Sequence, residues 1–241
     1  SFPISFSAGL ALTGGLAKST RILGFIGYFL IASAIIATQS RGGLLAIVAV
    51  SSVYAFYKIR SKLLVVSLGS IGIIVLTLFA GISDRSSGGA AESGVDESAQ
   101  GRLYAWQAAI RMANTHPFSG VGLDNFTVNY FYYSSHWDGM NHAVHSTWFG
   151  VLAETGYLGL VVFLILLFKV VTSMYQTVNK LKPLYAEGHC TAVLFCSAQS
   201  ILAGLAGFLA SGTFLTQGFT WPLYILLALS IAVQQQAKKL L

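Results

Sequence analysis

The chain has 241 residues, of which 55% are hydrophobic and only 9% are charged, and its net charge is +6. Its mean hydropathy is +0.70. Soluble domains carry about 25% charged residues, so this composition excludes an ordinary water-soluble protein and indicates a polytopic helical membrane protein. The chain has no basic stripe with interleaved aromatic residues, which argues against nucleic acid as a partner.

Seven apolar segments predict an all-α bundle of transmembrane helices. They are residues 2–17, 22–39, 43–57, 63–81, 147–169, 191–212 and 218–235. A helix of about 18 residues is about 27 Å long, close to the hydrocarbon thickness of a bilayer. We therefore divide the chain into N-terminal transmembrane helices (1–81), an extracytoplasmic loop (82–146) and C-terminal transmembrane helices (147–241). The start at Ser1, without signal-peptide features, suggests a piece of a longer membrane protein.

The basic residues are divided unevenly between alternate connections, which predicts the orientation. One set of connections holds most of the 14 Lys and Arg residues, namely Lys18, Arg21, Lys58, Arg60, Lys62, Lys169, Lys180, Lys182, Lys238 and Lys239. The other set holds only Arg41, Arg85, Arg102 and Arg111. Because cytoplasmic loops are enriched in Lys and Arg, the first set is expected in the cytoplasm and the loop 82–146 outside.

The predicted external loop has two parts of different character. Residues 86–100, SSGGAAESGVDESAQ, are small, polar and acidic, which is typical of a mobile linker. The next residues predict an amphipathic helix that ends near His116-Pro117, because the residue before a proline disfavours helix. A turn at Gly120-Val121-Gly122 follows. We expect this helix to lie on the membrane or to cap the bundle, with one face formed by Arg102, Trp106, Ala109, Ile110 and Ala113.

Two arginines on the predicted outer side are candidates for binding an anion. Arg102 opens the external helix, where free backbone N–H groups and the helix dipole favour negative charge. Alternatively, its side chain reaches lipid phosphates. Arg41 lies in the short turn TQSRGG, where Gly42 and Gly43 allow close approach of a partner. Its alternative role is that of an interfacial anchor.

Two histidines, His142 and His145, precede the apolar segment at 147–169 and share a helix face if that helix begins early. A neutral histidine at the membrane boundary can act as a general base, since its unperturbed pKa is near 6.5. The alternatives are a structural hydrogen bond and, together with His136, a zinc site.

Glu154 is an unusual carboxylate inside the same apolar segment. It lies nine residues after His145, on the opposite side of a continuous helix, so the two cannot form an acid–base pair on one helix. We expect Glu154 to hydrogen-bond to a neighbouring element inside the bundle. Glycines at 150, 156 and 159 are expected to let helices pack closely there.

Three motifs, taken in order, resemble the O-antigen ligase/polymerase superfamily of bacterial envelope proteins. They are TQSRGGLLAI at 38–47, GRLYAWQAAIRMANTHPFSGVGLDNF at 101–126 and HSTWFGVLAETGYLGL at 145–160. The resemblance implies a GT-C-like transferase in the bacterial inner membrane, acting in lipopolysaccharide or related envelope biosynthesis. Such an enzyme moves a glycan from an undecaprenyl-type polyprenyl diphosphate to an acceptor hydroxyl on the periplasmic side. The acceptor is a lipid A–core sugar, a polysaccharide or a protein, and the transfer is inverting and needs neither metal nor cofactor.

By this resemblance, Arg41, Arg102 and His145 match the family's catalytic positions, and both arginines also bind the donor. His145 either accepts the proton of the acceptor hydroxyl or positions the donor. Many relatives have asparagine where this chain has Ser146, which leaves the subfamily open and includes exosortase-associated ligases. His142 and Trp106 are further substrate-binding candidates.

Two points stay open after the resemblance is considered. Aromatic residues on the outer side form either a sugar-stacking platform or an interfacial belt; they are Trp106, Tyr130, Phe131, Tyr132, Tyr133 and Trp137. The alternative functions are a transporter and a non-catalytic envelope scaffold. A transporter is disfavoured because the ionisable residues gather at the outer face and only Glu154 lies deep in a span.

Overall fold

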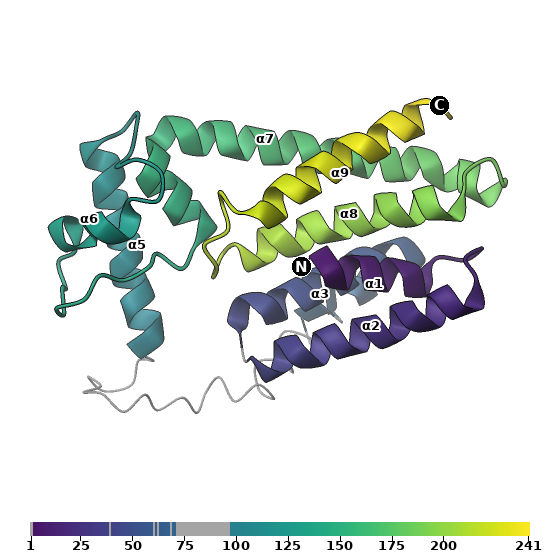
Figure 1. Cartoon of the computed structure of the whole chain (residues 1–241), viewed down its shortest axis with the longest axis horizontal. Helices are drawn as coiled ribbons and strands as arrows, with labels where there is room; N and C mark the ends of the chain where they lie inside the picture. Colours follow the sequence, from purple (N-terminus) through teal and green to yellow (C-terminus); the bar gives the residue numbers. More distant parts are fainter. Residues whose placement is uncertain (1, 39, 60, 62, 68, 71–96) are drawn as a thin grey trace. The chain divides into compact units, whose positions relative to one another are not determined.

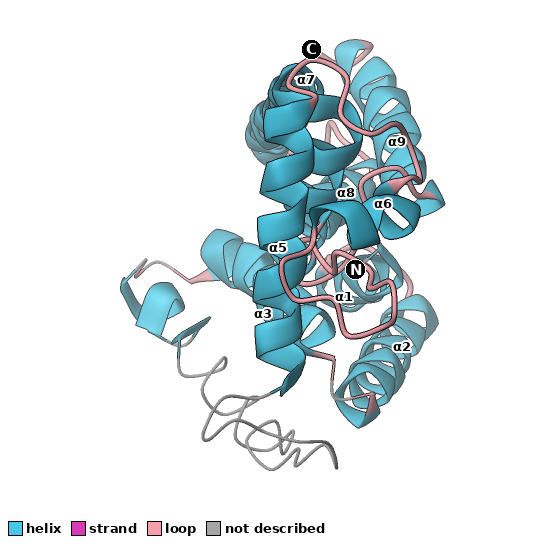
Figure 2. Cartoon of the chain, turned by 90° about the vertical axis from the view of Figure 1, so that its left-hand side faces the viewer, coloured by secondary structure: helices cyan, strands magenta, loops and turns pink. Residues whose placement is uncertain are grey.

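The computed structural model describes residues 2–38, 40–59, 61, 63–67, 69–70 and 97–241. In these ranges every regular element is an α-helix (Figure 2), which confirms the all-α prediction. The apolar segment predicted at 63–81 is described only to residue 70, and the linker predicted at 86–100 only from residue 97. The remaining parts of both, and the basic residues Arg60, Lys62 and Arg85, lie outside the described residues.

The helices are labelled in Figure 1. They are α1 (Phe2–Leu12), α2 (Lys18–Ala37), α3 (Arg41–Lys58), α5 (Glu97–Thr115), α6 (Phe126–Tyr133), α7 (Thr147–Ala186), α8 (Ala192–Ser211) and α9 (Trp221–Lys238). Among the described residues, α2, α7 and α8 are long and apolar enough to cross a membrane, and they coincide with three predicted spans. The helices α1, α3 and α9 occupy three further predicted spans but are shorter or less apolar, so their crossing stays a prediction.

The described chain forms two compact units. The first contains Ser1–Ile82, Phe168–Ser211 and Phe219–Leu241, and the second contains Ser83–Leu167 and Gly212–Gly218. Each unit has its own buried core.

In the first unit, α8 packs against α1, α3 and α9, and α1 also packs against α2. Small residues make these contacts close, as in other membrane helix bundles. A Cβ on Gly24 would lie 2.5 Å from the backbone nitrogen of Ala11, and one on Gly204 would lie 3.0 Å from Ser5 Oγ. Tyr54 of α3 donates a hydrogen bond of 2.8 Å to the carbonyl of Ser5 in α1.

The core of the second unit lies between α5, α6, the first turns of α7 and the segment before them. Its buried members are Ala105, Ala108, Ala109, Met112, Phe126, Tyr130, Val144 and Ala153. The helix α6 was not predicted from the sequence. The predicted end of α5 before Pro117 is confirmed, since α5 ends at Thr115.

The buried face of α5 agrees with the predicted one only in part, since Ala109 and Ala113 are buried as predicted. It is centred on Ala105, Ala108, Ala109 and Met112, whereas Ile110 is 39% exposed. The physical reason is size, because a row of alanines lets neighbouring backbone segments approach more closely than isoleucine does. This face of the helix is covered by protein, and the prediction that the helix lies on the membrane or caps the bundle stays a prediction.

The start of α7 also differs from the prediction of one continuous span over 147–169. The helix begins at Thr147 as expected but is broken at Gly156, where φ is 70° and ψ is −172°. Figure 1 shows the short first piece turned away from the long second piece. Gly156 therefore forms a bend, which was not predicted, and it also lies close to the backbone of Pro117, as a glycine expected to allow close packing can.

Candidate active site

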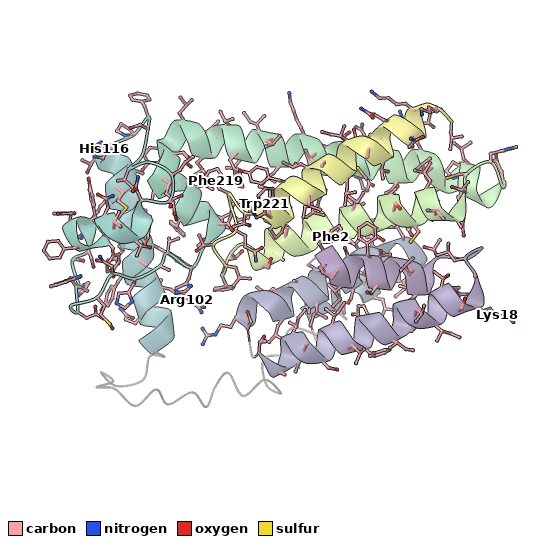
Figure 3. All side chains as sticks on the ribbon, viewed as in Figure 1. Phe2, Lys18, Arg102, His116, Phe219 and Trp221 are labelled. Carbon is pink, nitrogen blue, oxygen red and sulfur yellow. The ribbon has the colours of Figure 1, made fainter. Side chains whose placement is uncertain are left out.

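Arg102 and Trp106 lie one turn apart in the N-terminal half of α5, and Figure 3 labels Arg102 there. The indole of Trp106 donates a hydrogen bond of 3.1 Å from Nε1 to the carbonyl of Val144. Its ring stacks on Phe149, with centroids 4.9 Å apart and planes 14° apart. These two contacts attach the segment 144–149, which contains His145, to the helix that carries Arg102.

His145 does not lie on a helix, so the predicted shared helix face with His142 is wrong. It lies two residues before α7 and has a φ of +47°, which is rare for a residue with a side chain. Its side chain remains accessible to solvent. Partial burial lowers the pKa of His145 below its ordinary value of 6.5, and the positive charges of Arg102 and His142 lower it further. A ring that is neutral near pH 7 can accept a proton.

His142 is held by a carboxylate. Its Nε2 lies 2.8 Å from Asp138 Oδ2, and its ring makes an edge contact with Tyr130, with centroids 5.4 Å apart. The hydrogen bond from His142, helped by the backbone N–H of Met140, holds the pKa of the Asp138 carboxyl below its ordinary value of 3.8. This pair fixes the loop just before His145.

The third histidine of the proposed zinc alternative makes a different contact. The ring of His136 stacks on Tyr104, with centroids 3.9 Å apart. In the part of the chain that the structure describes, no group of three or more His, Cys, Asp or Glu side chains is arranged to hold a metal ion. The described residues therefore contain no cluster of ligands that supports the zinc alternative.

A junction of backbone hydrogen bonds joins the turn after α5 to the bend in α7. Val121 N–H donates to the carbonyl of Ala153 at 2.9 Å, Gly122 N–H to that of Glu154 at 3.1 Å, and Tyr157 N–H to that of Pro117 at 2.8 Å. These bonds satisfy the groups that the break at Gly156 removes from the helical ladder. The junction therefore fixes α5 relative to the first piece of α7.

Two glycines make this junction possible. A Cβ on Gly156 would lie 2.5 Å from the carbonyl oxygen of Pro117, and one on Gly120 would overlap the backbone of residues 153–155. Both have positive φ, 70° at Gly156 and 61° at Gly120. The sequence analysis identified the turn at Gly120 but not its partner in α7.

Glu154 has the architectural role that was predicted for it. Its carboxylate accepts hydrogen bonds from the backbone N–H groups of Asp124 and Phe126. Phe126 is the first residue of α6, and an anion at a helix N-terminus is favourable because the N–H groups there lack helical partners. The side chain therefore ties α7 to α6.

A second loop, Gly212–Gly218 between α8 and α9, belongs to the same unit. Within this loop, the ring of Phe214 lies 5.6 Å from the guanidinium carbon of Arg102. The loop is bonded to Thr147, whose N–H donates to the carbonyl of Gly212 at 2.8 Å and whose hydroxyl donates to that of Leu215 at 2.7 Å. Phe214 and Thr147 were not predicted as site residues, because neither residue type carries a sequence signal for such contacts.

The predicted site residues are divided between the two units. Arg102, Trp106, His142 and His145 lie in the second unit, whereas Arg41 belongs to the first. Arg41 is the first residue of α3 and follows Ser40, whose hydroxyl accepts from the N–H of Gly43 at 3.3 Å.

The aromatic residues predicted to form a platform differ in how far they are buried. Tyr130 is buried in the core, and one face of Trp106 is covered by Phe149. Phe131, Tyr132 and Trp137 are exposed. The exposed group is therefore smaller than the predicted set.

Comparison with known proteins identifies the family. No curated protein matches the sequence. The family model described as O-Antigen ligase matches residues 26–164, more than half of the chain, and this range contains Arg41, Arg102 and His145. The chain belongs to the O-antigen ligase family.

Proposed function

We propose that this membrane protein moves a glycan from a polyprenyl diphosphate carrier to an acceptor hydroxyl at the periplasmic side of the inner membrane. The family supports a glycosyltransferase of the O-antigen ligase/polymerase type. The observation that carries the finer proposal is that Trp106, one turn after Arg102, holds the segment that contains His145, and that the Arg102 charge helps to lower the pKa of His145. An anion-binding cation and a neutral base are the two groups that this transfer needs.

In the proposed reaction, the acceptor hydroxyl oxygen attacks the anomeric carbon of the donor sugar from the face opposite the diphosphate. The new C–O bond forms as the bond from that carbon to the diphosphate oxygen breaks, so the configuration is inverted. The bonding electron pair leaves with the polyprenyl diphosphate. The hydroxyl proton passes to the imidazole of His145, which later releases it to water.

The leaving group gains negative charge as the bond breaks. Arg102 stabilises that charge through its guanidinium N–H donors, which suit phosphate oxygens because they bind in pairs. We assign Arg41 the same role because it resembles the arginine of a family motif and lies within the matched residues 26–164. No metal ion is needed for charge neutralisation in this scheme.

Trp106 and His142 have supporting roles in this proposal. The indole N–H of Trp106 is already used by Val144, and one nitrogen of His142 is paired with Asp138. Both residues therefore hold the segment that carries His145, and any contact with substrate uses only their remaining surfaces.

The test is transfer of a fluorescent polyprenyl-diphosphate oligosaccharide by the full-length protein with EDTA present. His145→Ala, Arg102→Met and Arg41→Met are compared with His189→Ala and Arg111→Met, which change exposed residues of the same types. Loss of a general base costs about 10²- to 10⁴-fold in rate, so we expect losses of this size for His145→Ala and near wild-type transfer for the controls. Absence of wild-type transfer to lipid A–core, polysaccharide and protein acceptors would contradict the proposal and favour a transporter or a scaffold.

A further inference from the structure

The loop Gly212–Gly218 lies beyond the family match at 26–164, yet it contacts two parts of the proposed site. The first contact is at the start of α7. The hydroxyl of Thr147 accepts a hydrogen bond of 2.9 Å from the N–H of Gln217 and donates one of 2.7 Å to the carbonyl of Leu215. Its backbone N–H bonds to Gly212 at 2.8 Å. One residue therefore holds the loop at its beginning, middle and end.

The end of the loop also fits closely against α7. A Cβ on Gly218 would lie 2.6 Å from the Cγ2 atom of Val151. Thr147 itself is only 1% exposed, so its hydrogen bonds are shielded from competing water. The loop is thus fixed to the first turns of α7, two residues after His145.

The second contact is with α5. The guanidinium of Arg102 lies over the ring of Phe214 at 5.6 Å. An aromatic face attracts a guanidinium by its quadrupole, and a guanidinium held on its face keeps its N–H donors at its edges, where they can bind phosphate oxygens in pairs. Phe214 therefore restricts the orientation of Arg102 without using the donors that an anion needs.

Resting on the proposed function, we propose that this loop is a third component of the site, in which Phe214 is a positioning residue for Arg102 and Thr147 anchors the loop beside His145. The loop thus couples the placement of the anion-binding cation to that of the base. Phe214 does not contact the reacting atoms in this scheme and acts only through Arg102.

The proposal makes two measurable claims about Phe214→Leu, which keeps an apolar side chain but removes the aromatic face. First, the KM for the polyprenyl-diphosphate donor rises by about two- to thirtyfold, the range that corresponds to the loss of one cation–π contact, and kcat falls as well, because Arg102 also stabilises the leaving group. Second, His145 becomes easier to protonate, because Arg102 is no longer held at its place. The charged groups that act on His145 are Arg102 and His142.

The second claim can be measured without transfer activity. Diethyl pyrocarbonate acylates neutral imidazole, so the pH dependence of His145 labelling, followed by peptide mass spectrometry, reports its pKa in the full-length protein. We expect a midpoint below 6.5 in the wild type and a higher midpoint in Phe214→Leu. Phe214→Tyr keeps the aromatic face and should restore the wild-type midpoint and KM.

Thr147 is tested by a matched pair of variants. Thr147→Ser keeps the hydroxyl and should behave as the wild type, whereas Thr147→Val removes it at nearly the same size and should resemble Phe214→Leu. The control is Phe118→Leu, which changes an 80% exposed phenylalanine in the same unit. If Thr147→Val fails to fold, the His145 midpoint and the donor KM of Phe214→Leu alone test the proposal.

The proposal is overturned if Phe214→Leu leaves both the His145 midpoint and the donor KM unchanged while Arg102→Met moves them. It is also overturned if Phe214→Tyr fails to restore either quantity. A wild type without transfer, but with the expected midpoints, would contradict the proposed function while supporting the placement of Arg102 by the loop.

Discussion

We predict that Gly156→Ala weakens the junction between the turn after α5 and the bend in α7. The backbone there, with φ 70° and ψ −172°, is in a region that is essentially open only to glycine and costs other residues about 1–3 kcal/mol. The added Cβ would also lie 2.5 Å from the Pro117 carbonyl oxygen. If the junction opens to relieve this overlap, the three backbone hydrogen bonds described above are lost, each worth about 0.5–1.5 kcal/mol net.

Hydrogen–deuterium exchange of the full-length protein in detergent measures this locally. Peptides that contain Val121, Gly122 and Tyr157 should exchange at least about tenfold faster in Gly156→Ala, since about 1.4 kcal/mol corresponds to a factor of ten. The rest of α5 should be affected less, because its alanine face also packs against Phe126, Tyr130 and Val144.

Two further glycines provide the controls. Gly101, on α5, has open space around its Cβ position, so Gly101→Ala should stabilise the helix by about 0.5–1 kcal/mol. Gly139 has a φ of +97° and also open space, so Gly139→Ala isolates backbone strain from steric overlap. If Gly156→Ala exchanged no faster than Gly139→Ala at Val121 and Tyr157, the close approach of Gly156 to Pro117 would not hold the junction together.

Three further predictions concern the same unit. Arg102→Met should raise the pKa of His145, because a positive charge near the ring is removed, so the acid limb of the kcat/KM profile should move to higher pH; a profile that does not move would refute this electrostatic link. Trp106→Phe should lose the 3.1 Å hydrogen bond to Val144 but keep the stacking, costing about 0.5–1.5 kcal/mol of local stability by exchange of the segment 144–149. Unchanged exchange there would contradict that role. Glu154→Gln should weaken the N-terminus of α6 by about 1 kcal/mol, seen as faster exchange at residues 124–128 and not elsewhere.

The pH dependence of stability from His145 has a definite sign. Its pKa is lower in the folded protein than its ordinary value of 6.5, so the unfolded chain binds the proton more readily. The stabilisation is therefore complete above pH 6.5 and is lost as the pH falls from there through the folded pKa. The pKa of Asp138 is also lowered in the folded protein. Its contribution to stability is therefore present above its ordinary pKa of 3.8 and is lost as the pH falls from there.

The sequence predicted the parts of the fold that depend on local pattern. Apolar runs located α1, α2, α3, α7, α8 and α9, and Pro117 correctly predicted the end of α5. The arginine and histidine candidates came from their positions in the sequence, and the motif resemblance gave them catalytic roles; the structure places Arg102 and His145 in one unit. The structural features that the sequence did not predict depend on contacts between residues that are far apart in the chain.

The bend in α7 illustrates this limit. A glycine inside an apolar helix is compatible with close packing or with a break, and only the carbonyl of Pro117, about forty residues earlier in the chain, decides between them. The same holds for the start of α7, where His145 has a positive φ and Thr147 bonds to a loop near residue 215. On α5 the predicted face correctly included Ala109 and Ala113 but wrongly included Ile110 and left out Ala105 and Ala108, because close packing favours small residues.

The most direct test of the central claim separates donor binding from turnover in His145→Ala. Donor affinity and the single-turnover rate of transfer at saturating donor, with EDTA present, are measured for this variant and the wild type. We expect affinity within about twofold of the wild type and a rate about 10²- to 10⁴-fold lower, as for loss of a general base. A rate that survives, or a loss confined to donor affinity, would contradict His145 as the base.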